Sequence, residues 1–278
     1  METAFLPEQK KISYNTKIYT ALTIVVIVGS LLSLVFLNGL LAQFDAVSVT
    51  ETAPARVTHW SGYIIGLGDL QNKSEGVSSI TGTWIVPEIK YSENNTYSSV
   101  WVGVGGYGET SLIQAGTEQH CENGRITYFA WYELLPATIT TITTVEISPG
   151  DQITTSITLV DHAKNSWLIT LVDQTTGESF QKTVTYDSTR QTAEWIVERP
   201  TVNNQISTLA NFNQATLTDC STTINGVTGS IKDFTYTKAV MVDSMDNELV
   251  KTSALSSDGS SFNVTYLEPN QNTSSPNA

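Results

Sequence analysis

The feature that most constrains the fold of this chain is a succession of short segments, rich in β-branched and aromatic residues, between residues 59 and 266. Examples are SSITGTWIVP, RITYFAWYEL and QITTSITLV, and turn sequences such as SPGD and DQTTGE separate neighbouring segments. No long segment in this part of the sequence has the 3.6-residue periodicity of a helix. Many short strands joined by turns predict an all-β fold, built as an antiparallel sandwich or barrel.

An apolar segment precedes this β-rich part. Three lysines are followed by an uncharged run over residues 18–44, whose stretch 20–37 is rich in Leu, Val and Ile. The run is long enough to span a bilayer as a helix, and it exceeds the roughly 7–15 apolar residues of a signal-peptide core. We therefore expect a transmembrane signal anchor at 18–42, with residues 1–17 in the cytoplasm and the rest of the chain extracellular. Cleavage of the helix, which would secrete the protein, is the alternative.

The remaining chain divides by composition. The polar segment 43–57 is expected to be a linker, and residues 58–268 are expected to form one β-domain. The C-terminal residues 269–278 have the composition of a disordered tail. Nothing in the sequence indicates assembly, so we expect a monomer.

The balance of charge excludes one class of partner. The 278 residues carry 27 acidic and 14 basic side chains, with a formal net charge of −13 and a pI of about 4.5. Nucleic-acid binding needs clustered Lys and Arg, and the sequence has no such cluster. The acidity fits a secreted protein at ordinary pH, and equally a protein that works in acid, where carboxylates lose their charge.

Cysteines and sequons agree with export. In an oxidising compartment Cys121 and Cys220 could form one disulfide bridge, and two separate thiols are the alternative. Four Asn-x-Ser/Thr sequons are predicted to mark surface loops that could accept glycans: Asn72, Asn94, Asn263 and Asn272.

Several catalytic motifs are absent from the sequence. It contains no G-x-S-x-G elbow, no H-E-x-x-H zinc motif, no phosphate-binding loop and no Asp-Thr-Gly or Asp-Ser-Gly. The three histidines have no metal-ligand spacing, so neither a metal site nor a cofactor is predicted.

Polar side chains instead occupy strand positions that share a face with apolar ones. They are Gln114 in SLIQAG, Glu133 in FAWYELLP, and Glu194 and Glu198 in AEWIVERP. A buried amide or carboxyl group is costly unless it is paired, so each could be a hydrogen-bonded core group or lie exposed on an edge strand. Together they indicate a shared cleft, but strand parity alone does not rank Glu194 against Glu198.

An ordered set of stretches resembles the eqolisin family of glutamic peptidases. The set runs as HWSGYIIG, ITGTWIVP, SSVWVGVGGYG, LIQAGTEQ, YFAWYELLP, ISPGDQI, AEWIVERP, LANF and LSSDGSSFNVTY, and covers about residues 58–267. The resemblance implies a concanavalin-like antiparallel β-sandwich of two packed sheets, in agreement with the strand pattern. It also implies a glutamic endopeptidase, a hydrolase that acts on peptide bonds.

The resemblance assigns site residues as well. It implies that the catalytic pair is Gln114 of LIQAG and Glu198, the last glutamate of AEWIVE, and that Glu194 is not catalytic. It implies substrate-binding roles for five further residues: Trp60, Trp101, Trp131, Glu133 and Glu118. The chain departs from the fungal pattern where Gly105 replaces an acid, Glu118 replaces an aspartate and Pro200 replaces a phenylalanine. These departures leave the dyad intact and bear on the pH optimum and the subsite preference.

The implied reaction is hydrolysis of peptide bonds in acid. Ionised Glu198 would take a proton from the attacking water, and the amide NH2 of Gln114 would stabilise the oxyanion. A Gln–Glu pair avoids the repulsion between two carboxylates, so we expect hydrogen bonds that favour the charged form of Glu198. The expected partners are protein or peptide substrates and, through the N-terminal helix, the membrane.

Two other functions remain open at this point. An anchored adhesion or glycan-binding sandwich could use the same fold without catalysis. A β-glycan hydrolase could use Glu194 and Glu198, although residues four apart on one strand lie roughly 13 Å apart along its axis. Retaining glycosidases need carboxyl groups only about 5–5.5 Å apart.

Overall fold

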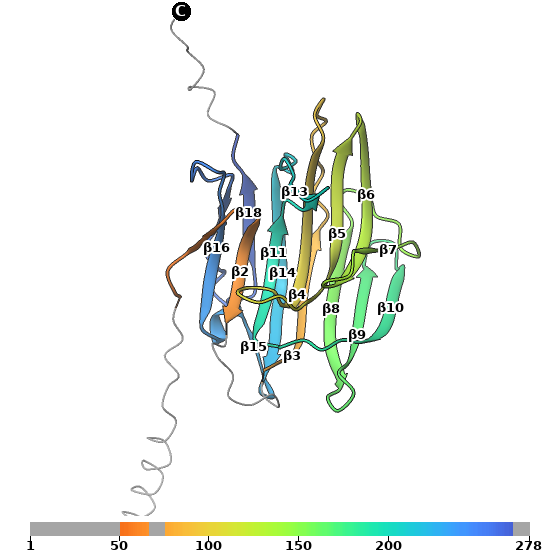
Figure 1. Cartoon of the computed structure of the whole chain (residues 1–278), viewed down its shortest axis with the longest axis vertical. Coiled ribbons are helices and arrows are strands. Elements are labelled where there is room, and N and C mark those ends of the chain that lie inside the picture. Colours follow the sequence, from red (N-terminus) through yellow and green to blue (C-terminus); the bar gives the residue numbers. More distant parts are fainter. Residues whose placement is uncertain (1–50, 67–75, 269–278) are drawn as a thin grey trace, which may run out of the picture. The chain divides into compact units, whose positions relative to one another are not determined.

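The computed structural model describes residues 51–66 and 76–268, which form two packed β-sheets (Figure 1). The first sheet has eight strands in the spatial order β1-β16-β2-β11-β4-β5-β6-β7. In this order the strands are Ala55–Val57, Tyr236–Met241, Trp60–Gly66, Thr192–Glu198, Thr96–Gly105, Leu112–Glu122, Arg125–Leu134 and Thr140–Ile142. Strand β1 is parallel to β16, and the other pairs in this sheet are antiparallel.

The second sheet runs in the order β10-β9-β8-β3-β14-β18-β17, with β15 paired to β14. In this order, with β15 last, the strands are Ser179–Thr185, Ser166–Asp173, Gln152–Asp161, Val77–Ile85, Gln214–Ile224, Phe262–Tyr266, Val250–Thr252 and Val227–Ser230. A small hairpin joins β12, Thr201–Val202, to β13, Gln205–Ile206. Within the described residues the one helix is the 3-10 turn η1, Ile231–Asp233.

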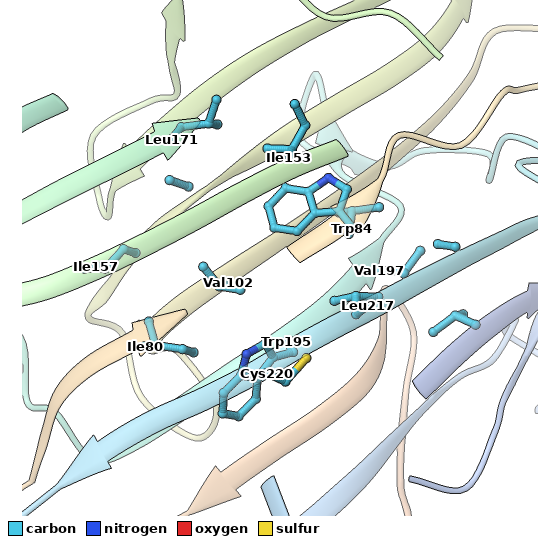
Figure 2. Close-up of a cluster of buried hydrophobic side chains, with 14 of the residues drawn as sticks. Ile80, Trp84, Val102, Ile153, Ile157, Leu171, Trp195, Val197, Leu217 and Cys220 are labelled. Atoms are coloured by element: carbon cyan, nitrogen blue, oxygen red, sulfur yellow. The ribbon is translucent and has the colours of Figure 1, made fainter. Parts of the chain in front are cut away.

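Strand β11 shows how alternating side chains build two different faces of the first sheet. Trp195 and Val197 belong to the main hydrophobic core, whereas Ile196 belongs to a smaller cluster of buried residues. Figure 2 shows Trp195 and Val197 in the same cluster as Trp84 of β3 and Leu217 of β14. One face of β11 therefore packs against the second sheet, and the other face is left for a site.

The large side chains of the core keep hydrogen-bond partners for their polar atoms. Trp195 Nε1 donates to the backbone oxygen of Thr81 at 2.7 Å, and Trp84 Nε1 donates to Thr117 Oγ1 at 2.9 Å. Burying a large apolar side chain contributes about 1.5–3 kcal/mol, and a satisfied N–H avoids the cost of an unpaired donor. Packing in the core thus fixes the position of β11, and with it the side chains on the face of β11 that points away from the core.

The N-terminal part of the fold prediction was wrong, whereas the all-β sandwich of two packed sheets is confirmed. No helix in the described residues is long and apolar enough to cross a membrane. The span expected at 18–42 lies outside these residues, as do the expected cytoplasmic segment 1–17 and the tail 269–278. The prediction rested on the length of the apolar run and on the lysines before it, which a membrane anchor shares with other apolar N-terminal segments.

One further expectation differs from the structure, and one alternative that the sequence left open is decided. Residues 55–57, at the end of the expected linker 43–57, form β1 and pair with β16. Cys121 and Cys220 are free and buried, so they form no disulfide bridge. They lie on strands of different sheets, and each sulfur donates to a backbone carbonyl near its own strand.

The sequons differ in their surroundings. Asn94 is exposed just before β4, as expected of a surface loop. Asn263 lies instead inside β18, where its Oδ1 accepts a hydrogen bond from Thr216 Oγ1 at 2.8 Å. Strand pairing and this bond make Asn263 a poor glycan acceptor. Asn72 and Asn272 lie outside the described residues.

Candidate active site

The candidate site lies on the face of the first sheet that points away from the core, where neighbouring strands bring polar side chains together. The antiparallel register places Glu198 of β11 opposite Ser99 of β4, and Ser99 opposite Glu118 of β5. It also places Gln114 of β5 opposite Glu133 of β6. Residues directly opposite each other point to the same face, so these side chains share one surface.

Glycines at the centre of this surface make room for Trp101. A Cβ atom on Gly116 would lie 2.2 Å from the backbone oxygen of Val100 and 2.6 Å from the Cβ of Trp101. A Cβ atom on Gly103 would lie 2.9 Å from the Trp101 ring. Side chains do not tolerate such distances without rearrangement, so glycine at both positions lets the indole lie against the sheet and reach Glu198.

A cleft of about 270 Å³ opens on this surface. It brings together both residues expected to be catalytic, Gln114 and Glu198, and it is lined by four of the expected substrate-binding residues: Trp60, Glu118, Trp131 and Glu133. Trp101 is buried and does not line the cleft. Sequence reasoning gave no role to six further lining residues: His59, Ser99, Leu112, Leu135, Ile139 and Thr201. The first four lie inside the family-like stretches, which could have pointed to them, whereas Ile139 and Thr201 lie outside these stretches.

Glu198 has a mixed environment in this cleft. Its Oε2 accepts a hydrogen bond from Trp101 Nε1 at 2.7 Å. Burial raises the pKa of Glu198 to about 7, and the indoles of Trp101 and Trp60 oppose this rise. Trp60 Nε1 lowers the pKa of Glu198 through its proximity to the carboxyl group, although it makes no hydrogen bond of standard geometry. Charges on Glu133 and Glu118 raise the pKa further.

The expected hydrogen bond to the charged form of Glu198 is therefore present, but it does not set the direction of the pKa shift. Removal of the carboxyl group from water outweighs the indole N–H groups. The side chain nevertheless keeps partial access to solvent through the cleft. Water in the cleft can donate to the carboxylate and moderate the effect of burial.

The amide of Gln114 is held by a neighbouring carboxyl group. Its Nε2 donates to Glu133 Oε2 at 2.6 Å. Burial raises the pKa of Glu133, and the bond from Gln114 opposes this rise. An ionised carboxylate can only accept, so this bond directs the NH2 end of the amide toward Glu133. The NH2 group retains a second N–H, and Gln114 Oε1 has no hydrogen-bond partner among the described residues.

The remaining polar groups of the cleft come from Glu118 and two indoles. Glu118 Oε1 lies 3.1 Å from His120 Nδ1, a contact that the sequence did not predict. Trp60 packs edge-on against Trp101, with 5.2 Å between ring centroids. Trp131 Nε1 is buried and, within the part of the chain described, has no partner. The described residues contain no group of three or more His, Cys, Asp or Glu placed to hold a metal ion.

Glu194 lies on the same face of β11 but does not line the cleft. It is fully buried. Its Oε1 accepts hydrogen bonds from the backbone N–H of Tyr107 at 2.8 Å and from Thr192 Oγ1 at 2.9 Å. The structure thus separates the two glutamates that strand parity could not rank.

The backbone explains why the chain carries glycine where the family pattern has an acid. Gly105 has a φ of +89°, in the region that side chains rarely adopt, and a Cβ atom there would lie 2.3 Å from the backbone oxygen of Ser111. An acid at position 105 would require a different path for the connection between β4 and β5.

Comparison with known proteins agrees with this geometry. The model of the Peptidase A4 family matches residues 58–266. Aspergillopepsin-2 of Aspergillus niger is 30% identical over 234 residues, which cover 76% of this chain and 78% of the relative. Scytalidopepsin B of Scytalidium lignicola is 28% identical over 196 residues, which cover 66% of this chain and 70% of that relative.

Solved structures of glutamic peptidases have the same fold. Scytalido-glutamic peptidase with a peptide-based transition-state analogue matches with a TM-score of 0.62 and 25% identity, covering 76% of this chain and 98% of that one. Aspergilloglutamic peptidase from Aspergillus niger matches with a TM-score of 0.54 and 32% identity, covering 62% of this chain and 99% of that one. The chain therefore belongs to the Peptidase A4 family, that of the glutamic peptidases, and is a hydrolase that acts on peptide bonds.

Proposed function

We propose that this chain is an endopeptidase that acts in acid, with Glu198 as the general base and Gln114 as the donor to the oxyanion. The observation that carries the proposal is the cleft, which combines a carboxyl group bound by an indole N–H with an amide held by a second carboxyl group. These are the two groups that hydrolysis of an amide requires: a proton acceptor for water, and a neutral donor for the developing negative charge.

The reaction follows from the chemistry of these two side chains. Ionised Glu198 holds a water molecule and accepts its proton as the water oxygen attacks the scissile carbonyl carbon. The carbonyl oxygen becomes an oxyanion, and the free N–H of Gln114 donates to it. Glu198, now neutral, returns the proton to the leaving nitrogen as the C–N bond breaks. The bond from Gln114 to Glu133 orients the amide, and the bond from Trp101 orients Glu198.

The raised pKa of Glu198 has opposite consequences for the two halves of this cycle. Burial stabilises the neutral form that exists after proton transfer, which makes Glu198 a stronger base. It also lowers the ionised fraction in acid, by tenfold for each pH unit below the pKa. Hydrogen bonds from cleft water and from the substrate favour the charged form, as the Trp101 bond does. We therefore expect the ascending limb of kcat/KM to lie below pH 7.

The substrates of the proposed reaction are proteins or peptides. The N–H groups of Trp60 and Trp131 and the Oε1 of Gln114 are buried and have no partners within the described part of the chain. A small shift of these side chains on binding would let them pair with the substrate main chain and satisfy them. Glu118 and Glu133 line the same cleft and are proposed to contact the substrate too. An extracellular or secreted location is part of this proposal, and a membrane anchor is not.

No second function is proposed. The glycan hydrolase considered from the sequence would use Glu194 together with Glu198 as its two carboxyl groups. Glu194 is fully buried and does not line the cleft, so it cannot reach a sugar held there.

Digestion of a denatured protein at about pH 2–5 tests the proposal. Wild type is expected to digest it, and Glu198→Gln and Gln114→Ala are each expected to lose on the order of 10²–10⁴ of the rate. The exposed substitutions Glu93→Gln and Gln152→Ala serve as matched controls and should retain it. Equal activity in all five proteins would contradict the assigned roles, provided that circular dichroism shows that each variant is folded.

A further inference from the structure

Glu194 is a buried carboxyl group with an uneven set of contacts. It lies on β11, four residues before Glu198, and none of its surface reaches solvent. Its Oε1 accepts two hydrogen bonds, from the Tyr107 backbone and the Thr192 hydroxyl. Its Oε2 is buried without a partner among the described residues. A carboxylate in this position would leave part of its charge uncompensated, whereas a neutral carboxyl group would not.

The contact with Tyr107 ties Glu194 to residues 106–111, the connection between β4 and β5. The space beside Gly106 is bounded by Leu112, by Glu194 Oε2 and by Trp60. Leu112 and Trp60 both line the cleft. The connection held by Glu194 therefore forms the support for this side of the cleft and leads directly into the strand that carries the catalytic glutamine.

A second carboxyl group lies in the same region. Glu109 Oε2 accepts hydrogen bonds from Ser111 Oγ at 3.0 Å and from the hydroxyl of Thr189. Its Oε1 is buried and, like Glu194 Oε2, finds no partner in the described residues. A proton on Glu194 would remove the charge repulsion between the two groups.

The charged groups that face Glu194 all raise its pKa. Glu109 from the 106–111 connection and Glu198 from its own strand both raise its pKa, after the larger effect of burial. Its register partners on the flanking strands are Ile64 and Gly103, which carry no charge. The bonds from Thr192 and Tyr107 oppose the rise without cancelling it.

We propose that the neutral carboxyl group of Glu194 is a positioning group that holds residues 106–111 against the cleft, and that loss of its proton as pH rises releases them and ends activity. This inference rests on the proposed function, because it concerns the regulation of the same cleft. A group with a raised pKa stabilises the folded arrangement below its ordinary pKa, and that stabilisation disappears as pH rises through the raised value. Glu194 thereby makes acid a condition for a complete site.

The pH dependence of kcat/KM in Glu194→Gln tests the proposal. Gln imitates the neutral carboxyl group and cannot ionise, so the descending limb is expected to move upward by about one pH unit or more. Glu109→Gln removes the repulsion that destabilises the arrangement once Glu194 is ionised, so its descending limb is also expected to move upward, by less than that of Glu194→Gln. The exposed control Glu93→Gln should show the wild-type limb.

Coincidence of the descending limbs of wild type, Glu194→Gln and Glu109→Gln would overturn the proposal. If Glu194→Gln does not fold, the limb of Glu109→Gln decides alone, and a limb that stays in place or moves downward would overturn it. Failure of the proposed function has a different signature, because wild type would then be inactive at every pH or Glu198→Gln would stay active.

Discussion

Glu198 and Glu194 lie four residues apart on the same face of β11, yet the two ends of that face are built differently. At the Glu198 end the face opens into a cleft. The carboxyl group there accepts a hydrogen bond from an indole N–H and is partly accessible to solvent. At the Glu194 end the connection 106–111 covers the face, and the carboxyl group binds a backbone N–H and a hydroxyl away from solvent.

The difference shows that the covering segment, and not the strand, decides what a carboxyl group does. Burial raises the pKa of both residues. Glu198 lines the cleft, so in the proposed reaction its raised pKa serves proton transfer with water. Glu194 has no such access, so in the proposal its proton serves structure and sets the upper pH of the arrangement.

The largest expected effect concerns the open end of the face. Glu198→Gln and Gln114→Ala together should lose on the order of 10³-fold or more in kcat. Because the two side chains act on one transition state, kcat of the double variant should be within about tenfold of kcat of the less active single variant. Steady-state kinetics on a quenched peptide measures this. If the loss of kcat in the double variant equals the product of the two single losses, the residues act independently, and the proposal that they form a dyad is wrong.

A smaller effect is expected when the covered end is disturbed. Gly106 has a φ of +113°, and a Cβ atom there would lie 3.1 Å from Leu112 and 3.2 Å from Glu194 Oε2 and Trp60. Gly106→Ala should lower the free energy of unfolding by about 1–3 kcal/mol, as measured by chemical denaturation in acid.

Gly177→Ala is the matched control for this substitution. Gly177 has a φ of +82°, and a Cβ atom there meets nothing within 4 Å, so only backbone strain is added. The stability lost by Gly106→Ala beyond this control reports the packing of residues 106–111 on the face. Equal losses in the two variants would mean that the covered end is not tightly packed.

The smallest expected effect concerns the indole at the open end. Trp101→Phe removes the hydrogen bond that lowers the pKa of Glu198, so the ascending limb of kcat/KM should move upward by about one pH unit. Trp84→Phe, which removes an indole bond to Thr117 in the core, should leave the limb in place. A downward shift in Trp101→Phe would contradict the role assigned to the indole.

The sequence predicted the faces of the strands well because the side-chain period of a strand is fixed. Parity grouped Glu194, Ile196 and Glu198 on one face and Trp195 and Val197 on the other, and the structure places Ile196 and Trp195 in separate clusters. The register that brings five strands of the first sheet together at the cleft was not readable, because it depends on pairings between segments far apart in the chain. Ser99 and His59 were missed for this reason.

The sequence also could not show which segment covers each end of the face. Residues 106–111 reach Glu194 from almost ninety positions earlier in the chain, with a backbone bond that no motif records. Hydrogen bonding to Glu198 could be expected from residue types, whereas the rise of its pKa depends on burial in the assembled sandwich. The membrane helix was inferred from an apolar run and the lysines before it, which lie outside the described residues. The sequence also left the pairing of the two cysteines open, and they lie buried in different sheets.

The most direct test of the central claim is the ratio of kcat/KM between Glu194→Gln and Glu198→Gln, measured side by side on one peptide at one acid pH with both variants folded. The two substitutions are chemically identical and differ only in position along β11. The account predicts that Glu194→Gln is at least on the order of 100-fold more active, because only Glu198 exchanges a proton with the substrate. A ratio near one, or a ratio in favour of Glu198→Gln, would contradict it.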